Sequence, residues 1–548
     1  MSKWYTEADL QDADLIWLLD LNLGGVVYRF SSETVSISND DETLVYDGTL
    51  SGVEFSSEME FASADFDLPS ASVTVTFKID LAERIAQGVD FGSATAQLSL
   101  FRKGSDDDYD DRQTLITGAV NAPSYGAIGE PVQFNIEADF LRNAEMMPGP
   151  SAIIDTGDNW PDADENSEGT VYPIIFGAPG HQGYYGSPIY VIDGLSDGAS
   201  SGGGTVHGLI AAHPCTAATI AVLRAKADGT STAYTSVSVV AGLDSNNQAY
   251  SYVDLTGKFT AGGGDTYFAK FNEGGGGLIN SFGLGKDSGG GTNQVQYLTG
   301  AGDVVRYLLH ESGAKVDDGR TRAAAAYLNA YEIEGYLAER VDIMEFLKTE
   351  ILPLLPCSLR TSSEGVYPVV WRYDATEADV NAKLTAGREI YRNSLVEYAS
   401  SEVYNEISIR YRHNCRYNRL KKKITVTGDL SATTSGFVSK NSYTVASRTR
   451  YGQKSKQIET EFVTSRSTAG RIVNWMSRAY SGRHRFIKYS ASHKMGWIQV
   501  GDVIALTDSD LSFTNQIVLV QSVEWGDDGL IFDFVLIPDI PRDTIPTS

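Results

Sequence analysis

The stretch YGQKSKQIETEFVTSRSTAGRIVNWMSRAYSGRHRFIKYSASHKMGWIQVGDVIAL, Tyr451 to Leu506, has the periodicity of a strand, then of a helix, then of a strand again. Ser467 is the expected N-cap of the helix and Gly482 its expected end. A helix held between strands in this way is expected to cover one mouth of a small barrel. Its apolar stripe consists of Ile472, Val473, Met476, Ala479 and Tyr480.

The same region is the most basic part of a very acidic chain. Residues 410–494 contain 19 Lys and Arg residues against three acidic ones, a net charge of +16, so the remainder carries −43 of the whole-chain charge of −27. Such a division is costly unless the two signs meet, between domains or between subunits. A solvated basic face and a nucleic-acid-binding patch are the alternatives, but no helix-turn-helix, zinc-finger or RNA-binding signature accompanies the charge.

Length and composition predict a β-rich protein of several domains. A chain of 548 residues is expected to hold about three or four domains. Its 54 Gly and 29 Tyr beside seven Met favour strands and turns over helix bundles. Cys215, Cys357 and Cys415 are far apart and odd in number, which indicates neither disulfides nor a zinc site and favours a reducing compartment.

The N-terminus, MSKWYTEADLQDADLIWLL, has acidic residues where a signal peptide needs basic ones. No uncharged apolar run approaches the roughly 18 to 20 residues of a membrane-spanning helix. The protein is therefore expected to stay soluble where it is made.

Residues 1–146 are predicted to form an N-terminal β-barrel-like domain. Strand signals recur about every 8 to 12 residues from Leu15 to Phe140. Gly24-Gly25 predicts a two-residue hairpin and Asp47-Gly48 a turn. One brief helix is expected near Leu81 to Gln87.

Three further domains are expected. Prolines and an acidic stretch after residue 146 mark a boundary, and residues 147–300 are predicted to be a Gly-rich β domain or insertion. Residues 301–420 are predicted to be an α+β domain, where Asp342 and Glu345 form a capping-box pattern and Pro353 stops the helix. Residues 421–548 are predicted to be a second β-barrel-like domain with one covering helix. The predicted fold class is mainly β and multidomain, with barrel-like domains and a few helices.

The sequence offers little chemistry. Its seven histidines show no H-E-x-x-H or comparable pattern. His207, His213 and Cys215 form the closest cluster, but loop or core roles are favoured over a metal site because a fourth ligand is not evident. Cys357 follows a proline at a helix end and is interpreted as a packing residue rather than a nucleophile.

Three other motifs superficially resemble ligand-binding loops. DDDYDD, residues 106–111, lacks the Gly and Glu of a calcium loop, so a solvated hairpin tip is favoured, and DADENSEG from Asp162 is interpreted likewise. GLGKDSGGG around Lys286 lacks the Ser or Thr that directly follows the Lys of a P-loop, and it lacks the upstream Gly. A flexible loop is therefore favoured. No catalytic, cofactor-binding or metal residue is predicted, and the protein is not expected to be an enzyme.

The order of several weak motifs resembles the central hub protein of the tails and baseplates of long-tailed bacteriophages. In the C-terminal part these are Tyr451-Gly452 before the helix, Gly501-Asp502 after it, and a closing strand pair. In the middle they are YPIIFGAPG, AGDVVRYLLHESGAKVD before an alanine-rich helix, and YNEISIRYRHN. The resemblance covers about half the chain, from Tyr172 to Pro538.

The resemblance implies a structural virion protein that forms a ring at the distal end of the tail. Such a ring is usually a trimer with two barrel-like domains per subunit, and it adapts a sixfold tube to a threefold tip. Expected partners are further copies of the chain, the distal tail ring and tube, fibre or tip proteins, and the tape-measure protein, with DNA only in transit. The expected location is the virion tail tip, after assembly in the host cytoplasm. One hypothesis is that the lumen of the ring is acidic. A structure in which Arg416 to Lys423 line the walls of the lumen would contradict it.

The chain also departs from this family. Some hubs hold an iron–sulfur cluster on four cysteines, which three scattered ones do not supply, so no cofactor is expected. Two other functions stay open: a receptor- or glycan-binding tail-tip protein, suggested by the aromatic and Gly-rich region 170–300, and a tail-associated peptidoglycan hydrolase. A sixfold distal-tail ring is the nearest structural alternative.

Overall fold

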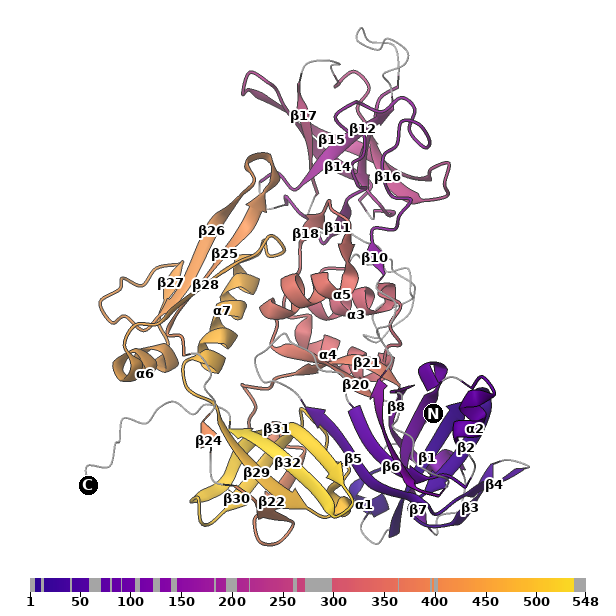
Figure 1. The fold of residues 1–548 in the computed structure, drawn as a ribbon. Coiled ribbons are helices and arrows are strands. Elements are labelled where there is room, and N and C mark those ends of the chain that lie inside the picture. Colours follow the sequence, from indigo (N-terminus) through magenta and orange to yellow (C-terminus); the bar gives the residue numbers. More distant parts are fainter. Residues whose placement is uncertain are drawn as a thin grey trace.

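In the computed structural model of the protein, the largest element is a sheet of 14 strands, built from the two ends of the chain (Figure 1). The structure describes residues 5–10, 14–39, 42–58, 70–78, 81–89, 91–103, 109–121, 129–138, 145–181, 184–193, 205–215, 217–259, 264–271, 298–362, 364–394, 397–398 and 403–536.

Seven strands of this sheet come from the N-terminal part and curl into a barrel-like unit, here the N-terminal unit. A bridge between Phe30 of β2 and Asp47, three residues before β5, brings the first and last strands close to each other. The predicted hairpin at Gly24-Gly25 is confirmed, with Leu23 opposite Val26 and both glycines at positive φ. The strands are β1 (Asp14–Leu23), β2 (Val26–Ser31), β5 (Leu50–Glu58), β6 (Ser70–Thr76), β7 (Thr95–Lys103), β8 (Gln113–Val120) and β9 (Pro131–Ala138).

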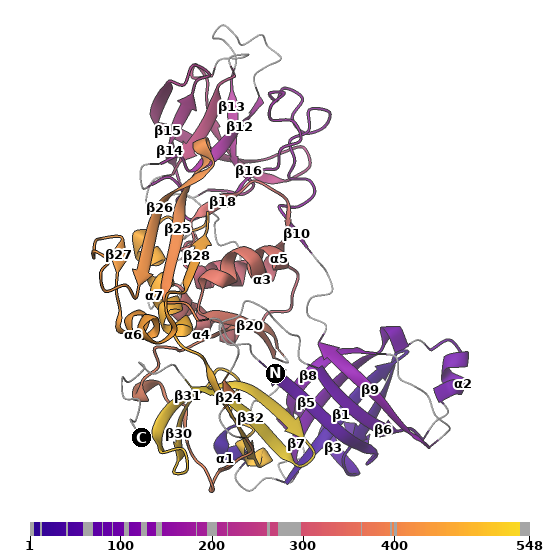
Figure 2. The same ribbon diagram turned by 60° about the vertical axis from the view of Figure 1, so that its left-hand side comes forward.

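The other seven strands form the C-terminal unit, which lies beside the first (Figures 1 and 2). Across the whole sheet the order is β2-β1-β7-β8-β9-β6-β5-β31-β32-β29-β23, with β22 on β30, β30 on β31 and β24 on β29. The strands are β22 (Ala382–Thr385), β23 (Ile390–Arg392), β24 (Glu397–Tyr398), β29 (Arg485–Ala491), β30 (Val503–Asp508), β31 (Phe513–Gly526) and β32 (Gly529–Leu536).

Small elements flank the N-terminal unit. The strands β3 (Val35–Asn39) and β4 (Glu42–Tyr46) pair as a separate hairpin. The helices are α1 (Glu7–Leu10) and α2 (Leu81–Ala86), and α2 lies where the sequence predicts a brief helix.

A closed six-stranded barrel lies at the opposite end of the molecule from the two units (Figure 1). Its strand order is β12-β13-β16-β15-β14-β17, and each pair is antiparallel. The strands are β12 (Ser187–Asp193), β13 (His207–Ala211), β14 (Thr219–Ala225), β15 (Ser231–Leu243), β16 (Ala249–Asp254) and β17 (Thr266–Lys270).

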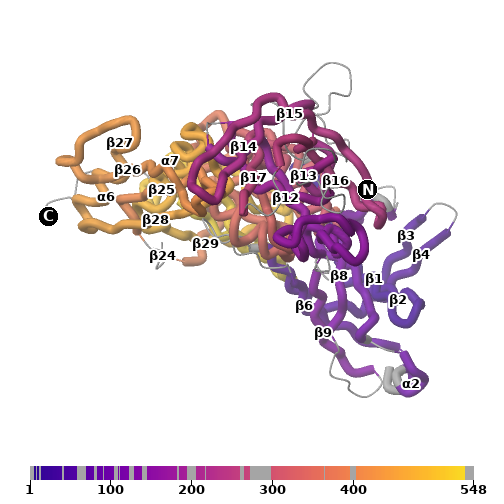
Figure 3. Tube along the Cα trace, turned by 90° about the horizontal axis from the view of Figure 1, so that it is seen from above, coloured from indigo at the N-terminus to yellow at the C-terminus, as the bar shows by residue number. Residues whose placement is uncertain are grey.

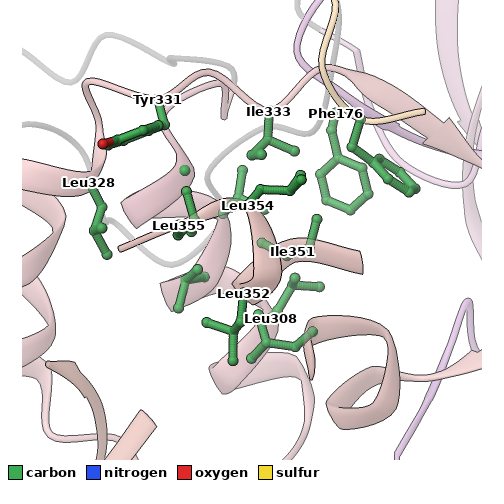
Figure 4. Packing of buried hydrophobic residues seen from close by; sticks show 14 of the residues in the cluster. Phe176, Leu308, Leu328, Tyr331, Ile333, Ile351, Leu352, Leu354 and Leu355 are labelled. Carbon is green, nitrogen blue, oxygen red and sulfur yellow. The ribbon is translucent and has the colours of Figure 1, made fainter. Parts of the chain in front are cut away.

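The middle of the molecule is helical and contains a large apolar core (Figure 4). Asp342 is the N-cap of its last helix and accepts a hydrogen bond from the backbone N–H of Glu345 at 2.8 Å, which is one of the two bonds of the predicted capping box. The elements are α3 (Ala301–Glu311), α4 (Asp318–Leu328), α5 (Ile343–Phe346), β20 (Cys357–Ser362) and β21 (Gly365–Val370), with two short pairs, β10 (Met146–Met147) with β19 (Val341–Asp342) and β11 (Ile174–Phe176) with β18 (Gly335–Leu337).

A four-stranded sheet with two helices projects from one side of the middle (Figure 1); residues 406–480 are here called the basic wing. Its strand order is β27-β26-β25-β28. The elements are β25 (Glu406–Asn414), β26 (Arg419–Thr427), β27 (Val438–Ser439), α6 (Ser442–Tyr451), β28 (Ser455–Glu459) and α7 (Arg466–Tyr480).

The structure confirms the mainly β, multidomain fold class, with 48% of the described residues in strands and 18% in helices. It differs from the sequence prediction around α7. That helix packs its stripe on the wing, where Ile472 and Val473 share a core with Ile407 and Ile424, and not over a barrel mouth. Its N-cap is Ser465 rather than Ser467, because the Ser465 side chain accepts the N–H of Thr468.

A second difference concerns the predicted strand at Tyr451-Gly452. Tyr451 is the last residue of helix α6, and Gly452 follows as its C-cap at φ +71°. Asn441 and Thr444 form a capping box at the start of this helix, which offsets the weak helix propensity of its Thr and aromatic residues. The strand of the sequence pattern is present but begins at Ser455.

Candidate assembly surfaces

The two barrel-like units are joined edge to edge by antiparallel pairing of β5 with β31, here called the seam. Ser522 to Trp525 lie opposite Glu58 to Phe55 in the register. The buried residues of both units form one apolar cluster, which is continuous across the seam. The two units are therefore held by shared backbone pairing and a shared core, not by a linker.

Three aromatic rings pack at the seam. Trp17 comes from the N-terminal unit, and Trp525 and His493 come from the C-terminal unit. The ring centroids of Trp17 and Trp525 are 6.2 Å apart in an edge-to-face arrangement, and His493 stacks on Trp525 at 6.2 Å. Both tryptophans are buried. Aromatic pairs in such geometries stabilise the folded state beyond the contribution of burying their apolar surface.

A carboxylate fastens the seam at a bulge. The register of β5 shifts between Ser51 and Glu54, where Gly52 takes φ +56°. Asp527, in the turn between β31 and β32, accepts the N–H groups of Gly52 at 3.1 Å and Val53 at 3.3 Å. The C-terminal unit thus supplies the acceptors that the bulge leaves without a strand partner.

A groove of about 630 Å³ follows the seam. Its polar lining consists of carboxyl and hydroxyl groups from β5, β6, β29, the end of β31 and the turn that follows it, together with the amide of Asn393. On β9, Gln133, Asn135 and Glu137 are exposed alternately with buried residues. Lys488 of β29 is neutralised by Asp533 at 3.2 Å. The groove's charged and serine residues are Glu54, Ser56, Ser70, Ser72, Ser490, Glu524, Asp527 and Asp528.

The basic wing satisfies only part of its charge internally. Arg410 pairs with Glu459 at 2.8 Å, and Arg448 pairs with Asp429 at 3.2 Å. The guanidinium of Arg450 lies 5.3 Å from the ring centroid of Tyr451. Arg448 is thus ion-paired, Arg450 lies by an aromatic ring and Lys454 is exposed.

The tip of the β25–β26 hairpin reaches the closed barrel. Arg416 donates to the hydroxyl of Tyr185 at 3.0 Å and to the carbonyl of Gly229 at 3.2 Å. Its guanidinium also lies 5.4 Å from the Tyr185 ring centroid. This contact fixes the wing against the barrel at one end.

The histidine and cysteine cluster is not assembled as a metal site. His213 is buried, accepts the N–H of Ile175 through Nε2 and contacts the Pro214 carbonyl through Nδ1. Burial lowers the pKa of His213 to about 4 and raises that of the Cys215 thiol to about 12. His207 pairs instead with Asp193 at 3.1 Å. Over the described ranges, no three His, Cys, Asp or Glu side chains are grouped to hold a metal.

The other singled-out residues have structural environments where they are described. Cys357 is buried in the apolar core, and burial raises the pKa of its thiol. In the DADENSEG segment, Glu168 accepts the N–H of Thr156 at 2.8 Å. Residues 106–108 of DDDYDD and the whole of GLGKDSGGG lie outside the described residues.

The seam residues were not found from the sequence. Asp527 lies in the turn motif WGDDG, which indicates a hairpin. Its hydrogen-bond partners, Gly52 and Val53, are 475 and 474 residues away in the sequence. Trp525 has the pattern of an ordinary buried strand residue. No local signal indicates that either residue joins two units.

Part of the chain matches a known family. Residues 439–520, from β27 to the middle of β31, match the model of the family described as "Putative phage tail protein". This match supports the conclusion that the protein is a structural protein of a phage tail and a component of the virion. No curated protein matches the chain.

Three solved structures align with this chain at low sequence identity. A tail protein from Neisseria meningitidis MC58 is 8% identical, with 95% of this chain and 96% of that chain covered and a TM-score of 0.39. The 43 kDa tail protein of prophage MuSo2 from Shewanella oneidensis is 9% identical, with 95% and 96% covered and a TM-score of 0.38. A chain of a native gene transfer agent virion is 13% identical, with 74% and 92% covered and a TM-score of 0.38.

Among the helices of the described segments, none combines the length and apolar character that crossing a lipid bilayer requires.

Proposed function

We propose that the protein forms the ring-shaped hub at the distal end of a phage tail. There it adapts the tail tube to the tip or fibres and forms part of the channel for the tape-measure protein and DNA. The observation that carries this proposal is the seam, which fixes two barrel-like units side by side in one sheet of 14 strands.

The seam matters because of symmetry. A sixfold tube offers six equivalent positions, and a tip built of three copies must present six similar units to meet them. Three copies of a chain with two fused barrel-like units supply that number. Because the units share strand pairing and core, their spacing within one copy is fixed, as a docking surface for a rigid tube requires.

The outer face of the seam is suited to line the channel. Its side chains are mainly small, polar or acidic, and Lys488 is paired with Asp533. Negative potential repels phosphates, so DNA slides past such a wall without the counterion-release attraction of basic surfaces. Arg416, at the wing tip, contacts the closed barrel of its own chain.

The partners of this hub are further copies of the chain, the distal tail ring and tube, fibre or tip proteins, and the tape-measure protein. The ring assembles in the host cytoplasm and ends in the virion. This role is mechanical, so the protein acts without a catalytic group or cofactor.

The test is electron microscopy of the purified full-length protein, combined with native mass spectrometry. The expected result is a ring with threefold symmetry, six density lobes around its channel and a mass of three chains of 59.4 kDa. A ring of six chains, or a chain that stays single at high concentration, overturns the proposal.

The channel assignment has its own test. Glu54→Lys with Glu524→Lys reverses two charges of the seam groove at positions that keep the strands paired. Particles carrying this variant should assemble but deliver DNA more slowly, because phosphates then bind the wall. The control is Glu339→Lys, which reverses a charge of the middle region away from the groove. Unchanged delivery by the seam variant contradicts the assignment.

Glycan binding by the closed barrel is the second candidate function, favoured by a row of aromatic rings. Trp160, Tyr250, Tyr252 and His207 follow one another with centroid separations of 5.1, 5.8 and 4.4 Å. All four are partly exposed, and Asp193 lies at the end of the row. Aromatic faces with a few polar groups are typical of ligand sites.

Glycan arrays with the full-length protein test this candidate. Tyr252→Ala should abolish any binding, while Tyr234→Ala, on the neighbouring strand β15 outside the row, should preserve it. Absence of binding by the wild-type protein, or equal binding by both variants, excludes the aromatic row as a glycan site.

A further inference from the structure

The exposed apolar side chains gather at two ends of the molecule. Among the described residues, ten large hydrophobic side chains are exposed, and six of them fall into two groups. One group lies on the basic wing and the other at the outer end of the N-terminal unit. Scattered exposed hydrophobic residues are ordinary, but groups of them mark interaction sites.

The wing group consists of Tyr417, Leu430 and Phe437, which are 49%, 72% and 43% exposed. Tyr417 lies in the turn between β25 and β26, with its ring centroid 6.2 Å from that of Tyr185, and Leu430 and Phe437 lie in the connection from β26 to β27. On this outer side, β27 pairs only with Thr425 and Val426 of β26. The rest of that edge of β26 has no neighbouring strand in the described part of the chain.

Cations surround the two aromatic rings of this group. Arg416, Arg419 and Lys421 lie 5.1, 5.3 and 5.1 Å from the Tyr417 ring centroid. Lys422 and Arg466 lie 5.6 and 5.2 Å from that of Phe437. Exposed Tyr beside Arg is the composition of interface hot spots. The wing as a whole has 15 Lys and Arg residues against four acidic ones.

The second group consists of Val26, Val27 and Val45, which are 54%, 42% and 59% exposed. They lie on β2 and on β4 of the separate hairpin. Glu42, on the same strand as Val45, is exposed. Residues 7–47 contain ten acidic residues and a single basic one, Arg29. Arg29, Lys78 and Lys103 pair with Asp20, Asp47 and Glu33. This end is thus apolar, and the remaining acidic residues give it an excess of negative charge.

The two groups lie at opposite ends of the molecule. Figure 1 places β26 and β27 on one side and β2, β3 and β4 on the other, with the middle region and both units between them. The view from above gives the same separation (Figure 3). A single chain therefore does not bring its own two groups together.

We propose that the wing of one copy docks on the β2–β4 end of a second copy of this chain. Tyr417 and Phe437 pack on the exposed valines, and the surrounding cations meet the acidic residues of that end. Apolar contact supplies the affinity, and opposite charge sets orientation and speeds association. The inference rests on the proposed ring, because two unlike faces at opposite ends are what a head-to-tail ring requires.

The test compares three matched pairs of substitutions in the full-length protein. The wing variant carries Tyr417→Ser and Lys421→Glu. The end variant carries Glu42→Lys and Val45→Lys. The control carries Tyr391→Ser and Lys383→Glu, an exposed tyrosine and an exposed lysine on strands of the C-terminal unit. All are surface changes, so unchanged circular dichroism and thermal midpoint verify the folds.

Sedimentation velocity measures assembly. The wild type and the control should form rings, while the wing and end variants should remain monomers to at least tenfold higher concentration. A mixture of wing and end variants retains one intact face on each, so it should stop at 1:1 dimers. Nothing in that mixture can propagate further.

The outcomes separate this inference from the hub function. If the wild type forms rings and the wing and end variants form them equally well, the proposed interface is wrong and the hub proposal still stands. Full rings from the mixture also overturn the head-to-tail contact. A wild type that forms no ring overturns both.

Discussion

Trp525→Ala is the substitution expected to separate the two barrel-like units. The indole is 4% exposed, packs edge-to-face on Trp17 and lies directly against Gly496, where an added Cβ would be 2.2 Å from its Cη2 atom. Burying an aromatic ring of about 250 Å² contributes up to about 6 kcal/mol at about 25 cal/mol per Å². Measured losses for buried Trp→Ala changes are about 3–5 kcal/mol.

Hydrogen exchange followed by mass spectrometry is the appropriate assay, because it measures opening of each segment in a multidomain chain. The opening free energy of β5 and β31 should fall by about 3–5 kcal/mol, the range for such cavities. The closed barrel, which is far from the seam in Figure 1, should exchange as before. Tyr391→Ala is the control, since this ring is 60% exposed and its loss should cost less than about 0.5 kcal/mol.

A double-mutant cycle isolates the contact across the seam. Trp17→Ala, Trp525→Ala and the double variant should give a coupling of about 0.5–1.5 kcal/mol for the ring pair. If Trp525→Ala leaves exchange in β5 unchanged while β31 loses protection, the core is not shared between the units. That result would refute the reasoning behind the seam and remove the main support for the hub.

Four further substitutions test the local structure. Asp527→Ala leaves the N–H groups of Gly52 and Val53 without their acceptor; they should exchange faster, at a cost of about 1 kcal/mol. Gly118→Ala places a Cβ 1.9 Å from the Glu137 carbonyl oxygen and should lower the stability of the β8–β9 pair by about 3 kcal/mol, measured by exchange in those strands. Ser465→Ala removes the cap of α7 and should cost about 1 kcal/mol in urea unfolding, whereas the exposed Ser467→Ala should have little effect. Burial raises the pKa of Asp502 from 3.8 to about 6, so its contribution to stability is largest below about pH 4 and is lost as pH rises through about 6; Asp502→Asn should flatten the thermal midpoint over that range.

Local sequence patterns predicted the elements that depend on neighbouring residues. The strand, helix and strand of the opening stretch are β28, α7 and β29. The turn at Gly501-Asp502 is present, with Gly501 at φ +91° and the Asp502 carboxylate accepting the N–H of Gln499 at 2.8 Å. Both features are set by residues a few positions apart, which is why pattern and turn chemistry suffice.

Helix α6 shows where local patterns fail. Its sequence, SYTVASRTRY, is rich in residues that favour strands, and it was predicted as part of a β-rich segment. Thr444 and Ser447 are buried, and the Thr444 hydroxyl donates to the carbonyl of Thr427 at the end of β26. The helix is thus held by caps and by tertiary contact, and propensity alone cannot indicate either.

The candidate surfaces were predictable only in outline. Charge counts indicated that opposite signs should meet, but they could not place Tyr417 and Phe437 on the wing and the three valines at the other end. The seam pairs strands that are more than 450 residues apart in the sequence. The alternation of apolar and polar residues indicates which face of a strand is buried. It does not indicate which other strand pairs with it. The stripe of α7 likewise indicates burial without indicating the wing as its partner.

Charge and symmetry together restrict how copies can associate. A twofold contact between identical faces would place wing on wing, or acidic end on acidic end, and would oppose like charges at the centre of the interface. A contact between the unlike ends instead pairs the wing, with 15 basic residues, and the acidic residues 7–47. Contacts of that kind continue from copy to copy and form a ring when the rotation between successive copies closes. Closure after three copies places six barrel-like units around one axis, because each copy brings two units at a spacing that the seam has already fixed.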